Sequence, residues 1–411
     1  MRYIINDQLS LSRPPEGPLA SHIRPFAKWA FEQGYVWYSV HRRVLLAAGF
    51  SQWLQRKGVS VEDVCWEHPA QYLRHRARQQ YMAYSDPPSL KQFMEFLRGD
   101  GIVTTKKTDF QPTAPVEQCV EEFKTYLQDQ RALAAATVCH YTSFIRCFLT
   151  KRFGNKTVQL GDLQADDVLG FVRRQSLRIG FKWAKLMTTA LRSFFQFARY
   201  RGDITADLGA AVPKVAGWSM TGIPRAIPAD EVRKLLSRVD RHSAKGRRDY
   251  AILLLLARLG LRSIEVVCLE LDDIDWREGC LTVRSKGRQT RLPLPAEVGE
   301  AVVTYLQHGR PRSTSRRLFL RSRAPFLGFR DSTSIAGIVR YAIERAGVHA
   351  PTRGAHQFRH ALATQMLRHG ASLKEIGQLL GHRSIEATKI YAKVDIDALR
   401  TLASPWPGGA Q

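Results

Sequence analysis

The chain has 411 residues, 44% of them hydrophobic and 24% charged, which is typical of a globular protein with two or three domains. Its 62 lysines and arginines outnumber its 37 acidic residues, so the formal net charge is +25 and a polyanionic partner, most simply nucleic acid, is indicated. No segment approaches the roughly 18 apolar residues of a membrane span and the first residues lack a signal peptide's apolar core, so we expect a cytoplasmic protein without a membrane partner.

Two segments rich in turn-forming residues divide the chain. The first is GDGIVTTKKTDFQPTAP at 99–115, and the second is VPKVAGWSMTGIPRAIP at 212–228. We therefore expect a helical N-terminal extension, a helical domain, a linker, and a larger C-terminal domain that ends in a tail. The expected bounds of these four parts are 1–110, 113–212, 213–228 and 229–411.

The N-terminal extension follows the same order of predicted helices as the helical domain behind it. In both, an aromatic helix precedes a longer basic and apolar helix, a polar turn, and a short basic helix with an acidic start. The acidic pairs are Glu62 with Asp63, and Asp166 with Asp167. The extension is either a faint second copy of the domain or an unrelated unit, because any two four-helix units share such a pattern.

The helical domain, residues 113–212, has apolar residues at helical spacing, such as Val116, Val120 and Phe123, which predicts an all-helical fold. Basic residues on its outer faces suit contacts with a DNA backbone, and they suit a solvated surface equally well. The candidates for DNA contact are Arg146, Lys151, Arg152, Arg173, Arg174, Lys182 and Lys185.

The C-terminal domain is predicted to be mixed α+β, mainly helical with a small antiparallel sheet. YAILLLLARLGL at 250–261 predicts a buried helix that breaks at Gly260, and a second helix begins near Ser263. GCLTVRSKGRQTRLPLP at 279–295 predicts a β-hairpin, and helices return from Ser332 onward.

An arginine-rich segment, RPRSTSRRLFLRSR at 310–323, lies between the hairpin and the last helices. It predicts further contacts with a DNA backbone, with Arg316 and Arg317 as the main candidates. A disordered basic loop is the alternative.

Cleavage of a DNA phosphodiester needs a nucleophile, stabilisation of charge on the non-bridging oxygens, and a proton for the departing oxygen. The acids Asp272, Asp273 and Asp275 crowd a single turn, and the six cysteines are scattered without a CxxC pair, so we expect neither a metal site nor a disulfide framework. No cofactor is expected. Without a metal ion, arginine side chains can stabilise the charge on the phosphate oxygens, because the planar guanidinium pairs with two of these oxygens and stays charged.

Several residues suited to this chemistry lie at exposed turns and helix ends. Arg262 follows a glycine turn and is presented at a helix start. Lys286 lies at the tip of the predicted hairpin, where its long side chain can reach into a cleft. His356 and Arg359, three residues apart in HQFRHALATQMLRHG, are neighbours on one helix surface, away from its apolar stripe.

Two more candidates follow. His382 comes directly after Gly381, a candidate helix C-cap, and Tyr391 comes nine residues later. The order Arg, Lys, His-x-x-Arg, His, Tyr closely resembles the signature of the tyrosine recombinase (phage integrase) family. The GLR stretch with Glu265 and the LLGH stretch before the tyrosine are also similar to that family, and the resemblance covers about residues 115–400.

The resemblance implies a multi-domain fold. Residues 113–212 would be the family's all-α core-binding DNA-binding domain, and residues 229–411 its mixed α+β catalytic domain. The all-α N-terminal extension lies outside the family's minimal architecture.

The resemblance also implies roles for individual residues. Tyr391 would be the nucleophile that forms a phosphotyrosyl bond with the 3′ phosphate of DNA. Arg262 and Arg359 would clamp the non-bridging oxygens, and His382 would donate a hydrogen bond to the same phosphate. Lys286 would protonate the leaving 5′ oxygen. Two helpers complete the set: His356 would assist proton transfer, and Glu265 would orient the site without reacting.

The family resemblance implies partners as well: double-stranded DNA, bound by four protomers, identical or mixed, on two DNA sites. Apolar residues in the tail, Ile396, Leu399 and Leu402, would form a helix face that packs into a neighbouring protomer or onto its own domain.

The function expected from this reading is a site-specific DNA recombinase or integrase, encoded by a mobile element. Two alternatives stay open. One is a related enzyme of the type IB topoisomerase or resolvase kind, which would not join two distinct sites. The other is a DNA-binding relative that has lost catalysis.

Overall fold

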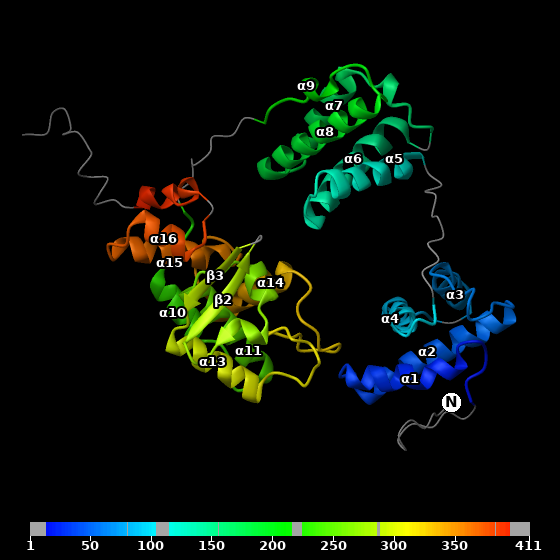
Figure 1. Cartoon of the computed structure of the whole chain (residues 1–411), viewed down its shortest axis with the longest axis horizontal. Coiled ribbons are helices and arrows are strands. Elements are labelled where there is room, and N and C mark those ends of the chain that lie inside the picture. The colour runs from blue at the N-terminus through cyan, green and yellow to red at the C-terminus, as the bar shows by residue number, and fades with distance from the viewer. Residues whose placement is uncertain are drawn as a thin grey trace, which may run out of the picture. The chain divides into compact units, whose positions relative to one another are not determined.

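The computed structural model of the chain describes residues 14–79, 81–103, 115–154, 156–215, 224–285, 288–382 and 384–394. Its contacts divide the chain into two compact units, one of residues 105–219 and one of residues 1–104 with 220–411. Three segments follow one another along the chain: an N-terminal segment (residues 14–103), a middle segment (residues 115–215) and a C-terminal segment (residues 224–394). In Figure 1 the colour runs from blue to red in this order. Each segment has its own apolar cluster, and the domain bounds expected from the sequence stay predictions.

The N-terminal segment consists of four helices packed around aromatic residues. Phe26, Phe50 and Phe93 are fully buried at its centre. The helices are α1 (Ala20–Glu32), α2 (Trp37–Arg56), α3 (Glu67–Ala77) and α4 (Asp86–Gly99). A helical extension was expected here, but whether it is a second copy of the following domain stays a prediction.

The middle segment is entirely helical among its described residues. Phe123, Phe148 and Phe194 are buried in its core, where Phe148 meets Phe195 edge-on at a centroid distance of 5.8 Å. Its helices are α5 (Pro115–Thr125), α6 (Ala135–Phe153), α7 (Ala165–Ser176), α8 (Phe181–Arg201) and α9 (Leu208–Ala211), with a π turn at Tyr126–Gln130 and a 3₁₀ turn at Leu160–Asp162.

The C-terminal segment combines helices with one small sheet, as the sequence predicts. Its helices are α10 (Ala229–Ser237), α11 (Ala244–Arg258), α12 (Ser263–Cys268), α13 (Ala296–His308), α14 (Ser332–Ala346), α15 (His356–Arg368) and α16 (Leu373–Leu379). Its strands are β1 (Ile274–Asp275), β2 (Cys280–Ser285) and β3 (Arg288–Pro293), and its 3₁₀ turns are Leu271–Asp273, Ile385–Ala387 and Lys389–Val394.

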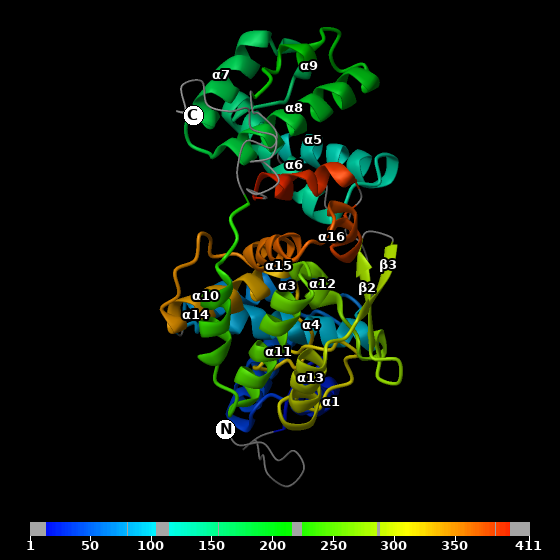
Figure 2. The same cartoon turned by 90° about the vertical axis from the view of Figure 1, so that its left-hand side faces the viewer.

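The sheet is antiparallel in the order β1-β2-β3. Leu281 pairs with Leu292, and Val283 pairs with Thr290, so the apolar residues of β2 face the helices. Figure 2 shows the β2–β3 hairpin extending toward α16. The hairpin expected at 279–295 is therefore confirmed.

Helix α11 is the centre of this segment. Every residue from 251 to 256 is buried, and the helix packs against α10, α12, α13, α14 and α15. Its start is capped by Ser243, whose hydroxyl oxygen accepts a hydrogen bond from the N–H of Gly246 at 3.1 Å. A helix buried on all sides explains the continuous apolar run in the sequence. None of the helices in the described part of the chain has the length and apolar character that a membrane crossing needs.

Gly260 joins α11 to α12 at a crowded point. Its φ is +60°, a left-handed conformation that costs little only for glycine. A Cβ atom added here would lie 2.9 Å from a methyl of Leu380 and 3.0 Å from a methyl of Leu362. The chain can turn between the two helices because this residue has no side chain.

We predict that Gly260→Ala destabilises the protein more than Gly279→Ala. Both glycines have nearly the same φ, +60° and +59°, so both substitutions carry a backbone cost of about 1 kcal/mol. Only at Gly260 does the added methyl meet neighbours, since nothing lies within 4 Å of it at Gly279. Urea unfolding followed by circular dichroism should show the larger loss for Gly260→Ala, and equal losses would contradict the crowding argument.

Candidate functional site

Arg262 is held at the start of α12 by one carboxylate. The Nη1 atom of Arg262 donates to Oε1 of Glu265 at 2.6 Å, and the backbone N–H of Arg262 donates to Oε2 at 2.8 Å. Glu265 is buried, whereas a third of the Arg262 side chain is exposed. The buried acid therefore caps the helix and orients the cation toward solvent, which is the orienting role expected for Glu265.

Arg359 lies at the centre of the site and is 2% exposed. Its Nη1 donates to the carbonyl oxygen of Gly260 at 2.8 Å, and its Nη2 donates to the carbonyl oxygen of Leu380. Burial, and secondarily the positive charge of Arg262, lower the pKa of Arg359 to about 10, so that it remains charged at neutral pH. No carboxylate forms an ion pair with it among the described residues, so carbonyl oxygens accept its hydrogen bonds, while the charge of the nearby Glu265 carboxylate partly offsets its own.

A cavity of about 470 Å³ opens beside the two arginines. Arg262, Glu265, Arg359 and His382 line it together with the tip of the β2–β3 hairpin. Ser285 and Arg288 are the lining residues nearest the hairpin tip, and Lys286, the expected general acid, follows Ser285 in the sequence but is outside the described residues. The cavity is cationic and of a size that admits a phosphate group.

Tyr391 lies in the short 3₁₀ turn Lys389–Val394 and is 1% exposed. Its hydroxyl oxygen is 3.1 Å from Nδ1 of His360. Burial raises the pKa of Tyr391, while the positive charges of Arg359 and Arg262 act in the opposite direction. The phenol is thus a neutral hydroxyl in the free protein, close enough to both guanidinium groups to sense their charge.

His382 follows α16 and stacks on the tyrosine. The two rings are parallel within 4° at a centroid distance of 6.4 Å. Nδ1 of His382 is 2.7 Å from the hydroxyl oxygen of Thr388, which is fully buried. Burial, followed by the charge of Arg359, lowers the pKa of His382 to about 4, so the ring is neutral at physiological pH.

His356 is the first residue of α15 and is exposed. It lines a second cavity of about 350 Å³ that also includes Arg262 but not Arg359. His356 and Arg359, expected as neighbours on one helix surface, therefore line different hollows, and Arg262 is common to both. The ring of His356 contacts that of His360 edge-on at 4.6 Å.

Two residues of the site were not assigned a role from the sequence. His360 directly follows Arg359 and is distinguished in the sequence only as one of the three histidines of HQFRHALATQMLRHG. Thr388 sits three residues before Tyr391, a position with no chemical signal of its own. Both contact a signature residue only because the chain folds back between α15 and the final 3₁₀ turn.

No group of histidine, cysteine and acidic side chains that could hold a metal ion is found in the described part of the chain. Two of the acids that crowd one turn are engaged elsewhere, since Asp272 pairs with Arg316 and Asp273 pairs with Arg284.

The expected DNA-contacting cations fall into two groups. Arg146 pairs with Glu117, Arg152 pairs with Asp167, and Arg317 bonds to the carbonyl of Cys268 and pairs with Glu270. The other group has no ion pair with any described residue. It comprises Lys151, Arg173, Arg174, Lys182 and Lys185, and all five are exposed. Whether either group contacts DNA stays a prediction.

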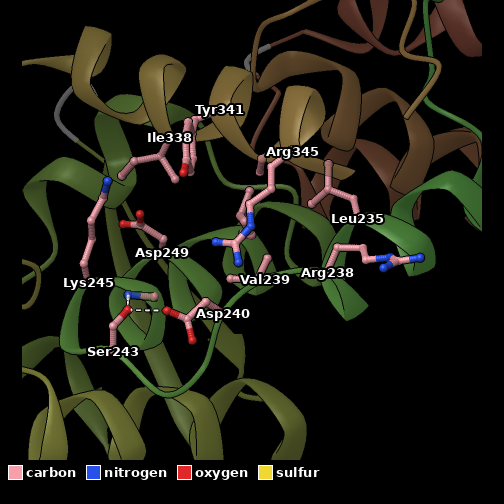
Figure 3. A pocket seen from close by; sticks show the side chains of 13 residues that line it. Leu235, Arg238, Val239, Asp240, Ser243, Lys245, Asp249, Ile338, Tyr341 and Arg345 are labelled. Atoms are coloured by element: carbon pink, nitrogen blue, oxygen red, sulfur yellow. Dashed lines mark hydrogen bonds between the residues drawn. The ribbon is translucent and has the colours of Figure 1, made fainter. Parts of the chain in front are cut away.

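A further hollow of about 190 Å³ lies between α10, α11 and α14. Figure 3 shows Arg345 and Lys245 projecting over it, with Asp240 and Asp249 nearby. Lys245 lies over the ring of Tyr341, 5.1 Å from its centroid. Three basic residues, with Arg238 as the third, and two acidic residues line it, and none of the six signature residues takes part, so this hollow is separate from the candidate site.

Comparisons with known proteins agree with this geometry. The model of the phage integrase family matches residues 225–397. A putative integrase/recombinase, y4rA of Sinorhizobium fredii, is 51% identical over 412 residues, with 100% of both chains covered. The tyrosine recombinase XerD of Listeria monocytogenes is 30% identical over 287 residues, which cover 67% of this chain and 93% of the relative.

A solved structure shares the fold. The XerH site-specific recombinase, bound to its palindromic difH substrate in a post-cleavage complex, matches with a TM-score of 0.56 at 18% identity. The match covers 82% of this chain and 94% of that chain.

We predict that folding stability falls as the pH drops from about 6.5 to about 4, in part because of His360 and His382. Both have a folded pKa of about 4 against an ordinary 6.5, so below pH 6.5 the unfolded chain binds protons that the folded chain excludes. Above that range the two rings are neutral in both states and cost nothing. Urea unfolding at pH 7 and pH 4.5 should show a decline that is smaller by about 3 kcal/mol in the double variant His360→Asn/His382→Asn, after allowance for partial exposure. An equal decline in wild type and variant would contradict it.

Five of the six signature residues thus lie around one cationic region, and the match to an integrase/recombinase and to a tyrosine recombinase covers 93% or more of each relative. The chain belongs to the phage integrase family of tyrosine recombinases.

Proposed function

We propose that this protein is a site-specific DNA recombinase of a mobile element, which cleaves and rejoins DNA through a covalent 3′-phosphotyrosyl intermediate on Tyr391. The observation that carries the proposal is the position of the Tyr391 hydroxyl. It is buried beside an imidazole, and the charges of Arg359 and Arg262 act on it. Burial raises the pKa of the phenol, and the two cations offset part of that cost for the ionised form, which is what a tyrosine nucleophile needs.

The arginines supply the electrostatic part of the reaction. Arg262 and Arg359 both line the cavity of about 470 Å³, where the non-bridging oxygens of a phosphodiester would accept their hydrogen bonds. Charge on these oxygens increases as the tyrosine oxygen attacks phosphorus, so fixed guanidinium groups stabilise the transition state more than the ground state. His382, beside the tyrosine ring, adds a third donor to the same phosphate.

The leaving group needs a proton. When the Tyr391 oxygen bonds to phosphorus, the bond from phosphorus to the 5′ oxygen breaks, and Lys286 protonates that oxygen to give a free 5′ hydroxyl. The phosphodiester bond is replaced by a phosphotyrosyl ester of comparable energy. A 5′ hydroxyl from another strand reverses the step, so rejoining requires neither ATP nor a new high-energy bond.

Assembly follows from the same chemistry, because strand exchange between two sites needs one tyrosine for each of the four strands. We therefore propose four protomers on two DNA sites, identical or mixed, with residues 113–212 and 229–411 both contacting DNA. The integrase/recombinase name of the relative that spans the whole chain supports a mobile-element role. The cytoplasmic location and the packing of the tail stay predictions, and Ile396, Leu399 and Leu402 lie outside the described residues.

We predict that the wild-type protein, incubated with a nicked DNA substrate from the ends of its own element, forms a covalent protein–DNA adduct that Tyr391→Phe does not form. The variant lacks only the nucleophilic oxygen, so it should still bind DNA. A denaturing gel with EDTA present throughout measures the adduct, and a mobility-shift assay measures binding.

The outcomes separate the candidate functions. An adduct that joins two distinct sites in a second reaction supports a recombinase, whereas an adduct that only relaxes or reseals its own DNA would indicate a topoisomerase-like or resolvase activity. Binding without an adduct, on a verified end sequence, would contradict the proposal and indicate a catalytically silent relative.

We predict that Lys182→Ala/Lys185→Ala weakens DNA binding and reduces its dependence on salt. Both lysines are exposed and have no ion pair in the described part of the chain. Removal of two phosphate contacts should make the slope of log K against log salt shallower by about 2. Lys124→Ala is the matched control, because Lys124 is engaged with Glu121 at 2.6 Å. A slope equal to that of the control would show that this face of α8 does not contact the backbone.

A further inference from the structure

The hydroxyl of the tyrosine nucleophile has one hydrogen-bond partner among the described residues, and that partner is His360. Nδ1 of His360 lies 3.1 Å from the phenolic oxygen, and the two rings meet edge-on at a centroid distance of 5.6 Å. His360 lies on α15, directly after Arg359, and is partly buried. Tyr391 is fully buried in the final 3₁₀ turn. The contact joins segments that are 31 residues apart.

The direction of this hydrogen bond follows from the protonation of its partners. Burial, then the charges of His356 and Arg359, lower the pKa of His360 to about 4, so its ring is neutral at physiological pH. Burial raises the pKa of the phenol, so the phenol keeps its proton. A buried hydroxyl needs an acceptor for that proton, and Nδ1 of a neutral imidazole protonated on Nε2 is such an acceptor. The tyrosine therefore donates and His360 accepts.

The other imidazole on the tyrosine is occupied. His382 lies parallel to the phenol ring, and its Nδ1 bonds to Thr388. The buried carboxylate of the site, Glu265, is engaged with Arg262 at both oxygens. Among the described residues, His360 is thus the group in direct contact with the proton that must leave when the tyrosine attacks.

We infer that His360 holds the Tyr391 hydroxyl and takes its proton as the oxygen bonds to phosphorus, an inference that rests on the proposed function. The O–H bond of Tyr391 breaks and its proton passes to Nδ1. Its electron pair forms the bond to phosphorus, and the bond from phosphorus to the 5′ oxygen breaks, with that oxygen protonated by Lys286. In the reverse step, the imidazolium returns the proton to the departing phenolate.

The substrate itself adjusts the basicity of His360. The groups that face this ring are His356 and Arg359 on α15, Tyr391 in the final turn, and the nearby His382, with no carboxylate among them. The positive charges in this set disfavour a proton on His360 in the free protein. A phosphodiester bound at Arg359 brings a negative charge that offsets them, so His360 becomes a better base when DNA is bound.

The test compares the cleavage rate of His360→Asn and His360→Ala with the wild type on a nicked DNA substrate. The amide oxygen of asparagine replaces Nδ1 as a hydrogen-bond acceptor but cannot take the proton. We expect both variants to cleave about 100-fold or more slowly. Their rates should rise about tenfold per pH unit between pH 7 and 9, because hydroxide must then remove the phenolic proton, while the wild-type rate levels off.

A substrate with sulfur in place of the 5′ bridging oxygen separates the two proton transfers, because a thiolate leaves without protonation. This substrate should restore cleavage by Lys286→Ala and leave the His360 variants slow. His369→Asn, on an exposed histidine at the end of the same helix, is the matched control and should cleave at the wild-type rate. Circular dichroism and DNA affinity verify that each variant folds and binds.

The possible failures are distinguishable. An adduct formed by the wild type and by His360→Asn at similar rates would overturn the inference and leave the proposed function intact. Slow variants whose pH profile parallels that of the wild type, or which the sulfur substrate restores, would also overturn it, because His360 would then act only on packing or on the leaving group. If the wild type forms no adduct, the proposed function fails and the inference fails with it.

Discussion

The site depends on one buried guanidinium. Arg359 donates to the carbonyl oxygens of Gly260 and Leu380, and so connects the turn after α11, helix α15 and the end of α16. A buried cation is costly unless dipoles or anions surround it, and here two carbonyl oxygens accept hydrogen bonds from Arg359 while the Glu265 carboxylate acts on it from beside Arg262. The same hydrogen bonds fix the turn that precedes Arg262, the helix α15, and the end of α16 that precedes His382.

This arrangement leaves the site with an excess of positive charge. Arg262 is paired with Glu265, but the charge of Arg359 acts on both neighbouring imidazoles and on the phenol. Each imidazole responds by staying neutral, and the phenol's ionised form gains stability from the same field. The free protein therefore has an uncompensated positive charge at this site. A bound phosphodiester would neutralise that charge without any change in the protonation of the protein's own groups.

Much of this could be predicted from the sequence, for identifiable reasons. The buried helix expected from residue 250, the hairpin at 279–295 and the second helix at Ser263 follow from an unbroken apolar run, alternating strands and a glycine break, which are local signals. The polar first turn of α11, which begins at Ala244, has no such signal. The signature residues could be proposed from the sequence because their types and order along the chain form a distinctive pattern. The contacts of His360 and Thr388 had no such signal, since they exist only where α15, α16 and the final turn meet. How His356 and Arg359 are placed also depends on tertiary packing. The spacing of three residues makes them neighbours along α15, but Arg359 is buried and His356 is exposed, so they line different hollows.

Glu265 has a consequence for how such an enzyme can change. One oxygen of its carboxylate marks where α12 begins, and the other sets the direction of the Arg262 side chain. The helix start and the aim of the cation are thus specified by a single buried residue. A substitution of Glu265 would therefore change the start of α12 and the direction of the Arg262 side chain together, and neither can change alone. Surfaces of the middle segment, such as the outer faces of α6, α7 and α8, carry no such double role, so a substitution there can change one property at a time.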